Sequence, residues 1–442
     1  MYSKKSLIVF IIFTLIMSTN VYVQADDYIE EDNEIESPSY IETSSKTTDI
    51  PQINARHAII YDRLSGRTLF GKSENEPCKM ASTTKIMTCL VILENIKDLK
   101  ETVIISKKAA GIGGSRLGLS TNDKITVENL LYGLMLCSGN DAAVALAEHV
   151  AGNIEEFAYL MNEKAASLEL NSTHFVTPHG LDNDDHFTTA YELAKLTNYA
   201  LSNKTFAKIV NTKSYTIYIN NRAKTLSNTN ELLGNLSGIY GVKTGFTNGA
   251  NRCLVTSCKR GEMDIICVVL GCDTKKNRTQ DSINLINYTF ENFKVVNVKE
   301  IIENDFNNWK KEHIDTITIN KGISSNLDLK LELCELPYSF VAVNNSVINK
   351  ISTSTKYTSY FEAPLLGNTP IGNISLNVDN EEYFILNIYN VETIKKKNFW
   401  DYWKIFITKI PSLTNWGDSL YLRILCPCIF YKILFPKLSK WI

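Results

Sequence analysis

Ser82 and Lys85 lie three residues apart in the segment ASTTKIMTC (81–89), where we expect a helix to begin. Residues at positions i and i+3 of a helix share one face, so the lysine amine can reach the serine hydroxyl. A serine hydroxyl is a poor nucleophile unless a base takes its proton. A neutral lysine can be that base, and burial beside another cation lowers the proton affinity of an amine. The spacing is consistent with an activated serine nucleophile or, alternatively, with a solvated helix face.

Two further polar motifs bear on this choice. Ser138-Gly139-Asn140 interrupts two apolar helical runs, and Lys243-Thr244-Gly245 ends a strand-like segment. Ser138 can relay a proton to a leaving amine, and Asn140 can hydrogen-bond a substrate amide. Each motif alone is weak evidence, because short polar motifs also occur by chance. Their order and their structural contexts together favour one catalytic cleft.

The third motif offers groups that suit the free end of a peptide. Lys243 is the expected second cation, and with Thr244 it presents a charge and a hydroxyl to a terminal carboxylate. Gly245 permits a close approach to the strand backbone. The backbone N–H groups of Ser82 and Phe246 would then hold the oxyanion.

These motifs, in this order, resemble those of the serine-type D-alanyl-D-alanine carboxypeptidases, the low-molecular-mass penicillin-binding proteins. The resemblance covers residues 54–295 and includes ASTTKIMT, LLYGLMLCSGNDAAVALAEHV, TPHGLD and GVKTGFT. It implies that peptidoglycan stem pentapeptides acylate Ser82 and lose their terminal D-Ala, that β-lactams acylate the same serine, and that no metal or cofactor takes part. The implied catalytic residues are Ser82, Lys85, Ser138 and Asn140, and the implied substrate-binding residues are Lys243, Thr244, Gly245, Phe246 and Thr247.

The sequence departs from the family pattern near the third motif. The family tends to read Ala-Gly-x-Cys where this chain has Ala250-Asn251-Arg252-Cys253. A side chain at residue 251 is expected to alter the strand turn beside the site. The middle motif reads Ser-Gly-Asn, as in the carboxypeptidase branch, rather than the Ser-Asp-Asn of the β-lactamases.

Other functions compete with this interpretation. A class A-like β-lactamase needs a Glu-x-x-x-Asn loop, but in SLELN (167–171) Ser167 stands at the glutamate position and Glu169 comes two places late. A non-catalytic cell-wall binding protein would keep the fold while relaxing the motifs. A His-assisted serine hydrolase is disfavoured because residues 113–117 lack the closing glycine of Gly-x-Ser-x-Gly.

A zinc peptidase is a further alternative, because histidines and aspartates cluster between residues 174 and 186. The segment is loop-like and contains no His-Glu-x-x-His helix, so a loop bordering the cleft explains it better. The candidate ligands are His174, His179, His186, Asp182, Asp184 and Asp185.

The elements that must position the three motifs alternate along the chain. Residues 57–72 predict two strands around a turn, and strand character returns at 239–245, 253–260 and 264–271. Helical periodicity fills the region between them, and a last helix fits 276–294. The pattern therefore predicts an α/β (α+β) fold in which helices cover one antiparallel sheet. The resemblance implies that this fold is of the β-lactamase/transpeptidase type.

The ends of the chain differ in composition from this core. Lys4 and Lys5 precede an apolar run, and Val23-Gln24-Ala25 offers a cleavage site, which indicates a secretory signal peptide and an exported protein. The segment 26–50 carries nine acidic residues and one lysine, which favours disorder. The expected parts are a signal peptide (1–25), an acidic linker (26–53), the carboxypeptidase domain (54–295), a β-sandwich domain (296–394) and an amphipathic tail (395–442).

The tail, with nine Lys/Arg and two Asp, places Phe399, Trp403 and Phe406 at helical spacing. No uncharged run is long enough to span a bilayer, so we expect the tail to lie on the outer face of the cytoplasmic membrane, or else to pack on its own protein. The β-sandwich region is expected to serve as a spacer or docking module. A net charge of -2 does not indicate a nucleic-acid partner. The ten scattered cysteines favour mostly buried free thiols.

Overall fold

The computed structural model describes residues 50–409. The predicted signal peptide, nearly all of the acidic linker and the tail after residue 409 lie outside the described residues. The chain divides into two compact units. The first comprises the residues up to Asn297 together with Tyr338–Ile348, and the second comprises Val298–Pro337 and the residues from Asn349 onward.

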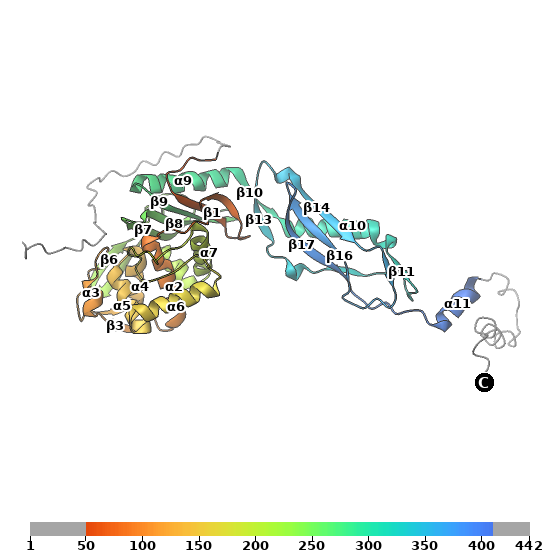
Figure 1. The fold of residues 1–442 in the computed structure, drawn as a ribbon, viewed down its shortest axis with the longest axis horizontal. Helices are drawn as coiled ribbons and strands as arrows, with labels where there is room; N and C mark the ends of the chain where they lie inside the picture. Colours follow the sequence, from red (N-terminus) through yellow and green to blue (C-terminus); the bar gives the residue numbers. More distant parts are fainter. Residues whose placement is uncertain (1–49, 410–442) are drawn as a thin grey trace, which may run out of the picture. The chain divides into compact units, whose positions relative to one another are not determined.

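A five-stranded antiparallel sheet forms the centre of the first unit (Figure 1). Its strand order is β2-β1-β9-β8-β7. Both ends of the unit contribute strands, as the sequence predicted. The bounds are β1 His57–Asp62, β2 Thr68–Lys72, β7 Ile239–Thr247, β8 Asn251–Arg260 and β9 Met263–Cys272.

The two faces of this sheet bury alternate residues of each strand. Ile59 and Tyr61 of β1 pack into a large helical core, whereas Ala58 and Ile60 pack on the opposite side. Helix α9 (Lys275–Asn292) covers that second face (Figure 1), and its Ile286 lies in the core there. The predicted layered α+β architecture is confirmed.

The helices of the first face surround α2 (Lys85–Asn95), whose first eight residues are all buried. Because α2 is covered on every side, a lysine at its first position is held inside the protein. The neighbouring helices are α3 Lys107–Gly111, α4 Val127–Leu136, α5 Asn140–Ala151, α6 Ile154–Ser167, α7 Ala190–Leu201 and α8 Lys204–Val210.

Three small two-stranded sheets complete the first unit. The sequence analysis did not predict them because each is short and its residues are partly exposed. They are β3 Thr102–Ile104 with β4 Lys124–Thr126, β5 Ser214–Ile219 with β6 Arg222–Ser227, and β10 Phe293–Asn297 with β13 Phe340–Asn344.

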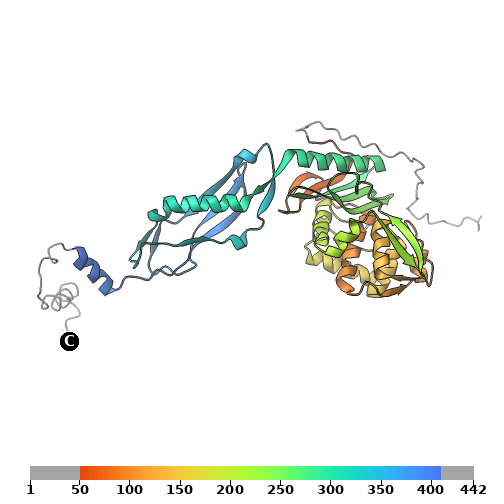
Figure 2. The ribbon, with the colours of Figure 1, turned by 180° about the vertical axis from the view of Figure 1, so that it is seen from behind.

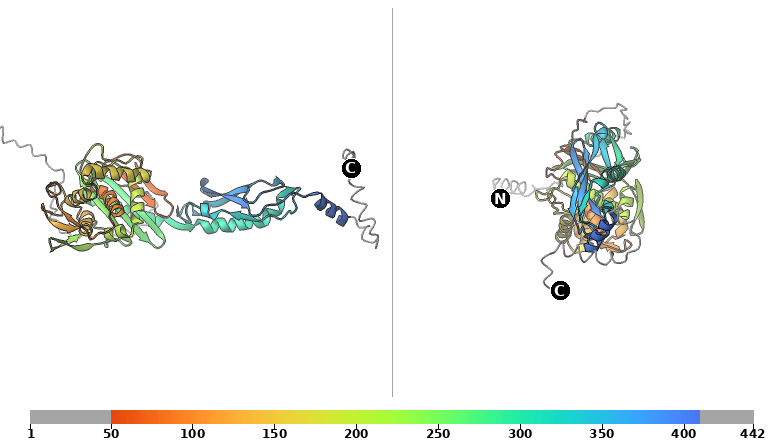
Figure 3. Two further views of the ribbon diagram at one scale, coloured as in Figure 1. Left: turned by 90° about the horizontal axis from the view of Figure 1, so that it is seen from below. Right: turned by 90° about the vertical axis from the view of Figure 1, so that its right-hand side faces the viewer.

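The second unit contains a four-stranded antiparallel sheet with the order β12-β17-β16-β14. Figures 2 and 3 show helix α10 (Val298–His313) lying along this sheet. The residues that it buries include Ile302, Phe306 and Trp309. The sequence analysis expected only strands in this region. The strands are β12 Leu329–Leu331, β14 Ile351–Tyr357, β16 Pro370–Val378 and β17 Glu381–Asn390, with a parallel pair of β11 Thr318–Asn320 and β15 Tyr360–Glu362.

Helix α11 (Phe399–Lys409) follows the second unit's strands. Its aromatic side chains stack along the helix, and Trp400 is 59% exposed. Within residues 50–409 no helix has the length and apolar character required to cross a membrane. All eight cysteines of this part of the chain are free thiols, and five of them are buried.

Candidate active site

Ser82 and Lys85 contact each other inside the first unit. Lys85 Nζ lies 2.7 Å from Ser82 Oγ, and the lysine is fully buried. The amine also donates to Asn140 Oδ1 at 2.7 Å and to the backbone carbonyl of His179 at 2.8 Å. All three contacts are to uncharged oxygens. The structure therefore brings the predicted serine, lysine and asparagine together around one nitrogen atom.

A short 3-10 helix, η1 (Ala81–Thr84), presents Ser82 ahead of α2. Ala81 has φ +48°, a left-handed conformation that alanine rarely adopts. Two hydroxyl groups hold this turn, because Thr83 donates to Met80 O at 2.6 Å and Thr84 donates to Ala81 O at 2.7 Å. Strain at one residue is sustained where neighbouring contacts fix the backbone, and such positions cluster at functional sites.

The second motif occupies the break between α4 and α5. Ser138 has φ +62°, and its buried Oγ has no hydrogen-bond partner among the described residues. Asn140 begins α5 and donates from Nδ2 to Gly113 O at 2.8 Å. The next residue, Asp141, accepts hydrogen bonds from the backbone N–H groups of residues 117–119, so it fixes the loop that borders the cleft.

The third motif lies on β7, the edge strand of the main sheet. Lys243 is 1% exposed and donates to the carbonyl of Thr244. A Cβ atom placed on Gly245 would come within 3.1 Å of Ser82 N. The strand therefore runs directly against the serine backbone at this glycine.

Phe246 and Thr247 have structural partners at the end of β7. The guanidinium carbon of Arg252 lies 3.8 Å from the ring centroid of Phe246, which is a cation–π contact. Thr247 donates its hydroxyl to Asp182 Oδ1 at 2.7 Å. Asn251, the first residue of β8, adopts φ +57°, so the side chain at the family's glycine position is accommodated in a left-handed conformation.

The loop at 177–186 contacts both Lys85 and strand β7. His179 supplies the carbonyl that accepts from Lys85, and Asp182 holds Thr247 and the backbone N–H of Gly249. Gly180 is required here because a Cβ at its φ of +87° would come within 2.0 Å of Ala81 O. The sequence predicted a loop bordering the cleft here, but none of its residues was predicted to be catalytic or to bind substrate.

His179 and His186 are buried and neutral at physiological pH. Burial lowers the pKa of His179 to about 3. Burial also lowers the pKa of His186 to about 4. His186 uses both ring nitrogens, because Nε2 lies 2.8 Å from Thr84 Oγ1 and Nδ1 accepts from Val176 N at 3.0 Å. Among the described residues, no three His, Cys, Asp or Glu side chains are grouped as metal ligands would be.

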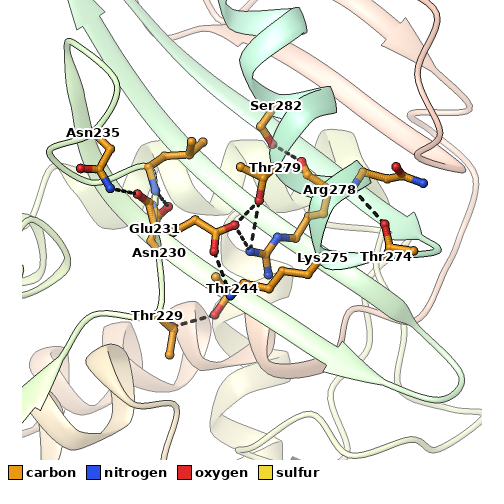
Figure 4. A network of polar contacts seen from close by, with 12 residues as sticks. Thr229, Asn230, Glu231, Asn235, Thr244, Thr274, Lys275, Arg278, Thr279 and Ser282 are labelled. Atoms are coloured by element: carbon orange, nitrogen blue, oxygen red, sulfur yellow. Dashed lines mark hydrogen bonds and ion pairs between the residues drawn. The ribbon is translucent and has the colours of Figure 1, made fainter. Parts of the chain in front are cut away.

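Thr229 is a residue of the site that the sequence analysis missed. Its Oγ1 lies 2.7 Å from Thr244 Oγ1 (Figure 4). The loop that carries it is anchored by Asn230, which donates to Gly241 O at 2.7 Å, and by Glu231. Glu231 pairs with the buried Arg278 of α9 at 2.9 Å. Although burial acts to raise the pKa of Glu231, the cations and the hydroxyl around it hold that pKa below its ordinary value.

Glu169 comes nearest in the sequence to the glutamate that a class A-like β-lactamase would need. Glu169 lies on the surface with φ +55°, its side chain is 84% exposed, and it pairs with Lys195 at 3.8 Å. Ser115 contributes only its carbonyl, which accepts from Asn140 N. The fold and the contacts of Ser82 together define a serine hydrolase in which a lysine, not a histidine, contacts the nucleophile candidate.

Comparison with known proteins agrees with this class. The family model described as D-alanyl-D-alanine carboxypeptidase matches residues 44–274. The chain is 31% identical over 350 residues to D-alanyl-D-alanine carboxypeptidase DacF of Bacillus subtilis, covering 78% of this chain and 87% of that protein. It is 36% identical to a D-alanyl-D-alanine carboxypeptidase of a Streptomyces species, covering 54% and 88% of the two chains.

Solved structures give the same result. The Streptomyces K15 DD-transpeptidase matches with a TM-score of 0.53 and 36% identity, covering 55% of this chain and 99% of that chain. The D-alanyl-D-alanine carboxypeptidase DacD of Francisella tularensis shares the fold with a TM-score of 0.62 at 22% identity, over 79% of this chain and 97% of that chain. The chain belongs to the D-alanyl-D-alanine carboxypeptidase family of serine peptidases.

Proposed function

We propose that this carboxypeptidase uses Ser82 as the nucleophile and Lys85 as its base on peptidoglycan stem pentapeptides. The observation that carries the proposal is the 2.7 Å separation of Lys85 Nζ and Ser82 Oγ in a fully buried environment. A neutral amine has two N–H groups and one lone pair. The N–H groups donate to Asn140 Oδ1 and His179 O, and the lone pair accepts the proton of Ser82.

The acylation step follows from these positions. Ser82 Oγ attacks the carbonyl carbon of the penultimate D-Ala while its proton passes to Lys85 Nζ. The backbone N–H groups of Ser82 and Phe246 stabilise the oxyanion, which the close packing of Gly245 on Ser82 N supports. As the C–N bond breaks, Ser138 relays a proton from Lys85 to the leaving amine. The terminal D-Ala then departs and leaves an ester on Ser82.

Hydrolysis of the ester completes the cycle. Water attacks the acyl carbonyl, gives a proton back through Lys85 and releases the tetrapeptide with Ser82 restored. β-Lactams acylate the same oxygen. Because Glu169, which comes nearest in the sequence to the glutamate that activates water in class A β-lactamases, is exposed on the surface, we expect the penicilloyl ester to be long-lived.

The free end of the pentapeptide binds along β7. Lys243 provides the positive charge for the terminal carboxylate, and the hydroxyls of Thr244 and Thr229 donate hydrogen bonds to it. Since β7 is an edge strand, an extended peptide can pair with its backbone. Thr247 supports this strand through its hydrogen bond to Asp182.

Mass spectrometry of the whole protein tests the proposal. Penicillin should add one mass equivalent, located on the peptide that contains Ser82, and pentapeptide should lose a single D-Ala. An unmodified protein and an intact pentapeptide would reject it in favour of a non-catalytic wall-binding protein. Rapid penicillin turnover without an adduct would instead indicate a β-lactamase.

The enzyme works outside the cytoplasm, where its substrate lies, and we propose that its C-terminal tail binds the outer face of the cytoplasmic membrane. Exposed Trp400, Tyr402 and Phe406 on α11, with the lysines of the tail, suit a helix in the headgroup region. The second unit then acts as a spacer or docking module. Full-length protein should sediment with anionic vesicles, whereas a chain ending at residue 394 should stay in the supernatant; equal sedimentation would reject the tail's role.

A further inference from the structure

The second unit contains a groove between helix α10 and strand β14, with a volume of about 410 Å³. One wall follows α10 and includes Asp305, Asn308 and Glu312, and the other follows β14. This volume lies in the range of ligand sites. The groove takes no part in the reaction proposed above.

Strand β14 is an edge of its sheet. In the part of the chain that the structure describes, it pairs with β16 alone, over seven residues from Ile351 to Tyr357. An edge of this length presents a row of backbone N–H and C=O groups along its outer side. Extended peptides bind such edges by adding a strand, and adjacent pockets select their alternate side chains.

Side chains of β14 and of α10 face each other along the groove. Thr353, Thr355 and Tyr357 alternate along β14 and point towards α10, where Thr353 donates to Asp305 Oδ2 at 2.7 Å. Asp305 and Glu312 are seven residues apart on the helix, about 10 Å along its axis. Side chains on one face of an extended strand recur every second residue, about 7 Å apart, so two long cationic side chains can reach both carboxylates. A guest strand beside β14 would therefore direct every second side chain towards the acidic wall.

The carboxylates and aromatic rings that line the groove favour a cationic ligand. The lining holds two carboxylates and no lysine or arginine. The rings of Trp309 and Tyr357 pack edge to face at 5.0 Å, and His313 stacks on Trp309 at 5.8 Å. Carboxylates beside aromatic rings favour ammonium or guanidinium groups. We propose that this groove binds an extended peptide segment of a partner protein that carries lysine or arginine at alternate positions, added as a strand to β14.

Two labelled peptides of equal composition test the proposal on the full chain. One has the sequence Thr-Lys-Val-Lys-Thr-Lys-Val, with alternating lysines, and the other groups the three lysines together. Fluorescence anisotropy should give at least tenfold tighter binding of the alternating peptide. Equal affinity of the two peptides would mean attraction by charge alone and would overturn the proposal, as would no binding at millimolar concentration.

Substitutions in the helical wall locate the site. Glu312→Gln should weaken binding of the alternating peptide about three- to fivefold, as loss of one partly exposed ion pair does. Asp305→Asn keeps an acceptor for Thr353, and the double variant should lose about tenfold. Glu303→Gln removes the same charge from α10 outside the lining and is the matched control. If the control weakens binding as much as Glu312→Gln does, the groove is not the site.

Amide exchange separates strand addition from other modes of binding. The alternating peptide should slow exchange within 351–357, and penicillin labelling of Ser82 should be the same in all these variants. Binding without protection of β14 would overturn the added strand. Because the labelling assay is independent, failure of the catalytic proposal would appear there and leave the peptide result unaffected.

Discussion

Gly245 lies against the backbone of Ser82 so closely that a Cβ atom at residue 245 would come within 3.1 Å of Ser82 N and 3.2 Å of Met80 O. Interiors are close-packed, so contacts this short force neighbouring atoms to shift. The approach of β7 to the nucleophile therefore depends on the absence of a side chain at this position. The relation joins two motifs that are more than 160 residues apart in the sequence.

Replacing Gly245 by alanine should displace β7 from Ser82. Because misplacement of reacting groups by about 1 Å can cost 10²-fold in rate, we expect penicillin acylation to slow about 10- to 100-fold. The free energy of unfolding should fall by about 1–3 kcal/mol, as for overpacking. Gly111→Ala is the control, since a Cβ there meets nothing within 4 Å. Acylation of Gly245→Ala at the normal rate would contradict the close-approach role.

Thr229→Val should weaken capture of the pentapeptide. The change keeps the side-chain shape but removes the hydroxyl that lies 2.7 Å from Thr244 Oγ1. Loss of a hydrogen bond to a charged group corresponds to roughly a tenfold increase in KM. Steady-state release of D-Ala measures the effect, and Thr229→Ser, which keeps the hydroxyl, should stay close to the native enzyme. Equal KM values for the valine and native enzymes would remove Thr229 from the binding site.

The buried histidines should make the protein less stable in acid. The folded pKa values of about 3 for His179 and about 4 for His186 lie below the ordinary value of 6.5. Between these limits the unfolded chain binds protons that the folded chain does not. Stability present at neutral pH is therefore lost as the pH falls from about 6.5 towards 4, by up to about 1.4 kcal/mol per pH unit for each histidine.

Denaturant unfolding between pH 7 and pH 4 measures this dependence. His186→Gln removes one titrating group and should flatten the slope, whatever its effect on stability at pH 7. His149, at the surface and paired with Glu101, offers a control, because His149→Gln removes an exposed imidazole. An unchanged slope in His186→Gln would show that this histidine does not titrate on unfolding.

Much of the catalytic unit could be predicted from the sequence because its signals are local. The strands β7, β8 and β9 are short runs of apolar and β-branched residues, and Ser82 and Lys85 are neighbours on one helical face. Thr229 could not be predicted in the same way. Its contact with Thr244 depends on how the loop at 228–231 folds against β7, and no spacing in the sequence encodes that contact.

Helix α10 could have been predicted, because its sequence has a helical pattern of apolar residues. Val298, Ile302, Phe306 and Trp309 recur at helical spacing and are buried on one side of the helix. The region 296–394 was nevertheless predicted to be purely β, because strand-like runs follow this helix in the sequence. The cleft loop at 177–186 is a different case, because its function depends on the backbone carbonyl of His179, which any residue could supply.

Intact-protein mass spectrometry after exposure to penicillin tests the central claim most directly, applied to the native chain, Ser82→Ala and Lys85→Gln. Glutamine keeps an amide that can donate to Asn140 and His179 but cannot act as the base, so acylation of Lys85→Gln should be about 10²- to 10⁴-fold slower. We expect one adduct on Ser82 in the native chain and none in Ser82→Ala. An adduct on Ser82→Ala, or native-rate acylation of Lys85→Gln, would contradict the account.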